Sequence, residues 1–145
     1  AKVFGISLVS AALVGTALLS AFTTNAADPA TMSKGEKIYK SYCVTCHQAN
    51  GKGMPDVYPP LAKSDFLTKK SKTEVAQALV FGLSGKVQVN GKNFNGMMPP
   101  IPGNYTSADI AAVLTYVYNS WGNPGTVVTA QEIDQVKKQG KPKKK

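Results

Sequence analysis

Hydrophobic positions recur at helical spacing in four segments of the chain, and each segment follows a start signal. In such a signal, a serine or threonine is followed three residues later by an acidic residue, so that each side chain can cap the other's backbone N–H group. Gly82, Gly122 and Gly140 follow the last three stripes and predict where those helices end. The four expected helices begin at residues 33–36, 71–74, 106–109 and 129–132, and the first should run into residues 43–47.

A β-hairpin is predicted over residues 86–94. Val87 and Val89 alternate with polar residues, and Asn90-Gly91 is the strongest two-residue turn signal. Residues 48–65 and 95–105 are rich in glycine and proline and predict loops. The expected fold is therefore mainly α, with three to five helices and one small hairpin.

The N-terminal stretch has a different composition. Residues 3–22 carry no charge, Lys2 precedes them, and small residues follow them up to Ala26. This order is typical of a secretory signal peptide cleaved after Ala26, although the run is also long enough for a membrane anchor that stays in place. Either interpretation puts the folded part outside the cytoplasm, in the periplasm. We therefore divide the chain into a leader or anchor (1–26), a main domain (27–125) and a C-terminal helix with a lysine-rich tail (126–145).

The net charge of +9 comes from 17 basic residues, all lysine, and eight acidic ones. The charge is unevenly distributed, because residues 137–145 hold six lysines and no acid. The body is nearly neutral and lacks the arginine-rich face expected of a nucleic-acid-binding domain. The basic tail is either a solvated end or a contact for an acidic partner or anionic lipid.

The segment Cys-Val-Thr-Cys-His, residues 43–47, contains both cysteines and the one histidine of the chain. A structural zinc site needs a second pair of ligands, and a thioredoxin-type disulfide needs a strand before its helix; the sequence shows neither. The remaining chemistry is covalent attachment of haem. Cys43 and Cys46 project to one side of a helical turn and can form thioethers with the two vinyl groups, and His47 is carried beneath the iron. An apolar haem would also supply a core to a small chain.

The sixth ligand of the iron must come from a methionine or a lysine, because no second histidine exists. A thioether is a suitable soft ligand, and ligation by histidine and methionine raises the reduction potential. Met32 lies too near the haem-attachment segment to reach the other face of the haem. A loop carrying Met54 would have to turn around the edge of the haem immediately after His47. Met97 and Met98 lie in a proline-stiffened loop about 50 residues further on, which makes either of them the better candidate.

These residues resemble the class I monohaem cytochromes c of bacteria, over about residues 32–123. The resemblance implies that Gly35 and Tyr39 of the first helix cross the helix that carries Leu114, Tyr116 and Trp121. It also implies that the carbonyl group of Pro59 accepts the proton on Nδ1 of His47. The axial methionine of the family is directly followed by proline, which favours Met98 over Met97.

The resemblance implies an electron carrier and not an enzyme: a single haem c with both axial positions filled exchanges electrons with respiratory redox proteins. Two alternatives remain open, a subunit fixed in a membrane respiratory complex and a catalytic or gas-binding haem protein. The latter would need an open sixth position, and the chain lacks the second histidine and the arginine usual in peroxide cleavage. Lysines that could surround the exposed haem edge and meet a partner are Lys52, Lys63, Lys69, Lys70 and Lys72.

Overall fold

The structure, a computed structural model, describes residues 26–142. Residues 1–25 of the predicted leader and the last three lysines lie outside this range. The elements in chain order are α1 (Pro29–Ile38), the π-helix η1 (Tyr39–Cys43), α2 (Val44–His47), α3 (Asp65–Lys69), α4 (Lys72–Phe81), β1 (Leu83–Val89), β2 (Lys92–Met98), α5 (Ser107–Tyr118) and α6 (Ala130–Gln139). Within the described range, no helix is both long and apolar enough to cross a membrane. The predicted fold class, mainly α with one small hairpin, is confirmed.

The first helix begins earlier than the sequence pattern predicted. Its N-cap is Asp28, whose side chain accepts a hydrogen bond from the backbone N–H of Thr31 at 3.0 Å, and Pro29 occupies the first turn. Ser33 lies inside the helix, so its capping-box pattern with Glu36 is not used. Proline is favoured at the start of a helix because its fixed φ suits that position and its missing N–H is not needed there.

The other three helix starts are confirmed. Ser71, Thr106 and Thr129 each accept a hydrogen bond from the backbone of the acidic residue three positions later, and each acid bonds back to the cap residue. Gly82 and Gly140 end α4 and α6 with positive φ values of 75° and 74°. The long helix α5 ends at Tyr118, four residues before the predicted stop at Gly122, and a turn follows it.

The hairpin forms as predicted but is longer. β1 and β2 pair antiparallel from Leu83 opposite Met98 to Val89 opposite Lys92, with Asn90-Gly91 as the two-residue turn. Both turn residues have positive φ (51° and 76°), a conformation that asparagine and glycine adopt with less strain than other residues. The tip of the hairpin is tied to the start of α3: Asp65 N–H donates to the side-chain oxygen of Asn90 (2.9 Å), and Asn90 N–H donates to the Asp65 carboxylate (2.7 Å).

Helices α1 and α5 cross at close range. A Cβ atom on Gly35 would lie 2.6 Å from the Cβ of Tyr116, so only glycine fits at the crossing point. Beside it, Tyr39 packs against Tyr116 and Trp121, with ring centroids 5.6 and 5.0 Å away. This is the helix contact that the resemblance implied for Gly35 and Tyr39.

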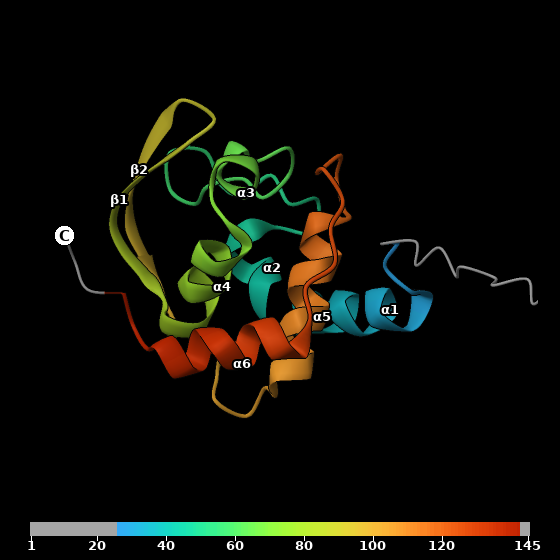
Figure 1. Cartoon of the computed structure of the whole chain (residues 1–145). Coiled ribbons are helices and arrows are strands. Elements are labelled where there is room, and N and C mark those ends of the chain that lie inside the picture. Colours follow the sequence, from blue (N-terminus) through green and yellow to red (C-terminus); the bar gives the residue numbers. More distant parts are fainter. Residues whose placement is uncertain (1–25, 143–145) are drawn as a thin grey trace, which may run out of the picture.

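The C-terminal helix α6 is part of the same core. It lies across α4 and α5 (Figure 1) and buries Ile133 and Val136 completely or nearly so. Thr115 of α5 anchors the preceding loop, because its hydroxyl oxygen accepts a hydrogen bond from Val128 N–H at 3.0 Å. Lys72 and Glu132 form an ion pair between α4 and α6. Helix α6 therefore supports the far side of the two helices that, with the hairpin, enclose the cavity described next.

Candidate haem site

The continuous helical run α1–η1–α2 carries Cys43, Cys46 and His47 to the edge of an internal cavity. His47 is 8% exposed, and its Nδ1 lies 3.0 Å from the carbonyl oxygen of Pro59. A carbonyl oxygen can only accept, so Nδ1 carries the proton and Nε2 keeps a free lone pair. Burial lowers the pKa of His47, and the bond to Pro59 opposes that shift only partly. A neutral imidazole with a free Nε2 is the form that binds a metal.

The loop after His47 is folded so that the Pro59 carbonyl reaches the imidazole. Gly53 N–H donates to the backbone oxygen of His47 (3.0 Å), and Met54 pairs with Tyr58 in an isolated β-bridge. Gly53 has a φ of +66°, and a Cβ there would lie 2.6 Å from the oxygen of Pro59. The predicted contact between Pro59 and His47 is thus present, and it depends on a tight turn at Gly53.

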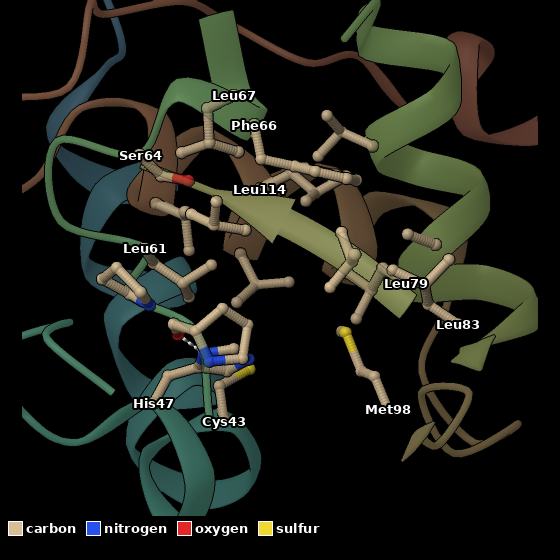
Figure 2. Close-up of a pocket in the computed structure, with 18 residues that line it drawn as sticks. Cys43, His47, Leu61, Ser64, Phe66, Leu67, Leu79, Leu83, Met98 and Leu114 are labelled. Atoms are coloured by element: carbon tan, nitrogen blue, oxygen red, sulfur yellow. Dashed lines mark hydrogen bonds between the residues drawn. The ribbon is translucent and has the colours of Figure 1, made fainter. Parts of the chain in front are cut away.

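The cavity in front of His47 is large and almost wholly apolar. Its empty volume is about 720 Å³, a figure that includes the open mouth. Walls come from α4, α5, the hairpin and the loop that leads into α3 (Figure 2). The lining residues are Cys43, His47, Pro59, Pro60, Leu61, Ser64, Phe66, Leu67, Val75, Ala78, Leu79, Leu83, Val87, Val89, Met98, Val113, Leu114 and Val117.

Met98 faces His47 from the opposite wall. Figure 2 shows its sulfur directed into the cavity, toward the imidazole. Met98 is half-buried, whereas its neighbour Met97 is 76% exposed, because successive side chains of a strand point to opposite faces. Gly82 allows this placement: a Cβ there would lie 2.7 Å from the backbone oxygen of Met98.

The other two methionines do not line this cavity. Met32 lies in α1, before the haem-attachment segment, and Met54 is 42% exposed in the loop that precedes Pro59.

The residues around the cavity fit a covalently attached haem. Cys43 borders the cavity and Cys46 is half-buried one helical turn further on. The two cysteines form no disulfide. Burial raises the pKa of the free Cys43 thiol to about 11, so before haem is attached this group is neutral at physiological pH. Within residues 26–142 no group of three or more histidine, cysteine and carboxylate side chains is arranged to hold a metal ion.

Comparison with known proteins agrees with this geometry. Residues 32–121 match the family model described as "Cytochrome c". The chain belongs to the cytochrome c family. It is 35% identical over 111 residues to "Cytochrome c-552" of Thermus thermophilus, an alignment that covers 71% of this chain and 83% of that protein.

Other relatives of this cytochrome c are much longer proteins. The "Alcohol dehydrogenase (quinone), cytochrome c subunit" of Gluconobacter oxydans is 28% identical over 110 residues, which cover 74% of this chain and 23% of the relative. The "Cbb3-type cytochrome c oxidase subunit CcoP" of Rubrivivax gelatinosus is 28% identical over 107 residues, which cover 73% and 31%. In these cases the similarity extends over about a quarter to a third of the relative.

Membership of the family confirms three predictions: the resemblance, the cofactor and the electron-transfer role. As in other cytochromes c, haem c is attached through the CxxCH motif, here Cys43, Cys46 and His47. The haem iron supplies reversible one-electron chemistry. The chain's own residues exclude water from the cavity, orient the imidazole through Pro59 and present one sulfur opposite to it.

The sequence interpretation did not single out Ser64, a polar residue of the cavity wall. Ser64 is 2% exposed and lines the cavity, although Ser-Asp ahead of a short helix is ordinarily a capping signal. The short helix α3 itself was also missed, because residues 48–65 were interpreted as one loop and no start signal was recognised at its end.

Proposed function

We propose that this cytochrome c is an electron carrier whose haem iron is ligated by His47 and Met98, and that it serves redox proteins outside the cytoplasm. The observation that supports the ligand pair is the position of the Met98 sulfur, across the apolar cavity from the imidazole (Figure 2). With both axial positions filled, the iron changes oxidation state with no site for a substrate. Histidine and methionine together favour a high reduction potential.

The ligand pair is tested with carbon monoxide. We expect the visible spectrum of the reduced protein to stay unchanged when the gas is added, because Met98 occupies the sixth position. Met98→Ala should open that position, so that the spectrum shifts with carbon monoxide and the reduction potential falls. Met97→Ala is the matched control, since it removes the same side chain from the exposed face of the same strand.

Two results would contradict the proposal. A spectral shift of the unmodified protein with carbon monoxide would mean an open sixth position, and would favour the catalytic or gas-binding alternative. An equal effect of Met97→Ala and Met98→Ala would remove the reason to assign the ligand to Met98.

Transient docking is proposed to use lysines near the loop that carries Pro59. Lys69, Lys70 and Lys72 are paired with Asp65, Glu74 and Glu132. Lys52 and Lys63 are exposed and form no ion pair with any residue that the structure describes. Unpaired lysines offer their full charge to an acidic partner and increase the association rate at low salt.

A second candidate function is a fixed subunit of a membrane complex. It is supported by the relatives named as cytochrome subunits of a quinone-dependent alcohol dehydrogenase and of an oxidase. The two candidates differ in fractionation: a shuttle is recovered in the soluble periplasmic fraction, whereas a subunit sediments with the membranes and keeps its partners after a salt wash. The first outcome is the one we expect.

A further inference from the structure

Ser64 presents a hydroxyl group to the cavity without a partner in the protein. The residue is 2% exposed, and its Oγ forms no hydrogen bond with any described residue. Buried hydroxyl groups are nearly always hydrogen-bonded, because losing water without a replacement is unfavourable. The unpaired hydroxyl of Ser64 therefore requires a physical explanation.

The local backbone would allow Ser64 to cap α3, but its side chain does not do so. Its φ and ψ of −79° and 122° are those of an N-cap residue, yet no N–H group of the helix bonds to its Oγ. Ser71, Thr106 and Thr129, in the same position at three other helices, all make that bond. The hydroxyl of Ser64 is thus turned away from its own helix and into the cavity.

The position of Ser64 in the cavity indicates which chemical group its hydroxyl would contact. Of the lining residues, only His47 and Ser64 carry a nitrogen or oxygen in the side chain, and Nδ1 of His47 is already bound to Pro59. Figure 2 shows Ser64 at the end of the cavity opposite Cys43. Thioether bonds hold a haem by its vinyl groups, and the two propionates project from the opposite edge of the porphyrin. Ser64 therefore lies at the end of the cavity where carboxylate groups are expected.

We propose that the Ser64 hydroxyl donates a hydrogen bond to a haem propionate. A bond of this kind is charge-assisted, keeps the carboxylate ionised inside an apolar cavity, and fixes the edge of the haem that the thioethers do not hold. The inference rests on the covalent haem and not on Met98, so it stands even if the proposed sixth ligand is wrong.

The test compares Ser64→Ala with Ser64→Thr, which keeps the hydroxyl, and with Ser71→Ala. The last is the matched control, because it removes a serine N-cap from the neighbouring helix on the exposed surface. The readout is the infrared difference spectrum between reduced and oxidised protein, with isotope-labelled propionate carboxyl carbons to identify their bands. We expect the propionate band to shift in Ser64→Ala, and to keep its wild-type position in Ser64→Thr and Ser71→Ala.

A Ser64→Ala spectrum identical to that of the unmodified protein overturns the proposal. A loss of stability in Ser64→Ala with an unchanged propionate band overturns it as well, because the hydroxyl would then contribute to the fold and not to a bond with the haem.

A measurement on the unmodified protein covers the case in which the alanine variant does not fold. In the proton NMR spectrum of the reduced, diamagnetic protein, we expect a slowly exchanging hydroxyl proton of Ser64 with a nuclear Overhauser contact to a propionate methylene group. A hydroxyl proton that exchanges rapidly with water, or one that contacts only protein atoms, contradicts the hydrogen bond.

Discussion

Gly53→Ala should disturb the histidine ligand without touching it. Gly53 has a φ of +66°, and an added Cβ would lie 2.6 Å from the oxygen and 2.8 Å from the carbon of the Pro59 carbonyl. That oxygen holds Nδ1 of His47 at 3.0 Å. The backbone cannot rotate away as a flexible side chain would, so the loop must move and the hydrogen bond to the imidazole must lengthen.

The expected loss of stability has two contributions. An alanine with positive φ costs about 1 kcal/mol more than glycine. Collision with a fixed backbone adds about 1–3 kcal/mol. Gly91 separates these contributions, because its φ is +76° and a Cβ there meets nothing within 4 Å. Gly91→Ala should therefore lose only about 1 kcal/mol, and Gly53→Ala about 1–3 kcal/mol more.

The reduction potential should also change. The hydrogen bond from Nδ1 makes the imidazole more basic, which favours the more highly charged, oxidised iron. Weakening this bond should therefore raise the potential. A hydrogen bond contributes about 1 kcal/mol, and about 1.4 kcal/mol corresponds to 59 mV for one electron, so the rise is at most about 40 mV.

Both quantities can be measured on the same preparations, by guanidinium denaturation of the haem-loaded protein and by potentiometric titration. The reasoning is refuted if Gly53→Ala and Gly91→Ala have the same stability and the same potential. A lower potential in Gly53→Ala would also contradict the assigned role of the Pro59 carbonyl.

Two further predictions concern the contact between α1 and α5. Gly35→Ala gains about 1 kcal/mol of helix propensity but loses about 3 kcal/mol through overlap with Tyr116, so denaturation should show a net loss of about 2 kcal/mol. Gly96→Ala, where a Cβ meets nothing, should change stability little, and equal stability of the two variants would contradict the close crossing. The Lys34 ammonium and the capping bonds of Thr106 lower the pKa of Asp109 to about 2, which is below its value in the unfolded chain. The ionised carboxylate therefore contributes fully to the stability of the fold above about pH 4, and this contribution is lost as the pH falls toward about 2. Asp109→Asn should flatten that part of the stability profile, and an unchanged acid limb would show that the ion pair does not contribute.

Short-range features of this cytochrome c could be predicted from its sequence, because the atoms involved lie a few residues apart. The spacing of Cys43, Cys46 and His47 is enough to predict the haem attachment, since three residues make about one helical turn. The capping boxes at Ser71, Thr106 and Thr129 and the Asn-Gly turn are equally local, and all of them are present in the structure. A local pattern failed where a second signal competed nearby, at Asp28-Pro29, which starts α1 ahead of Ser33.

Tertiary packing decided the features that depend on which side of an element faces the core. Sequence spacing alone could not distinguish Met97 from Met98. The pairing of β1 with β2, together with the close approach of the Met98 backbone to Gly82, turns one sulfur into the cavity and the other outward. The Ser64 hydroxyl lines the cavity and does not cap its own helix, an arrangement that no capping rule predicts. Burial and long-range contact arise only when distant segments meet, so neither can be deduced from the spacing of neighbouring residues.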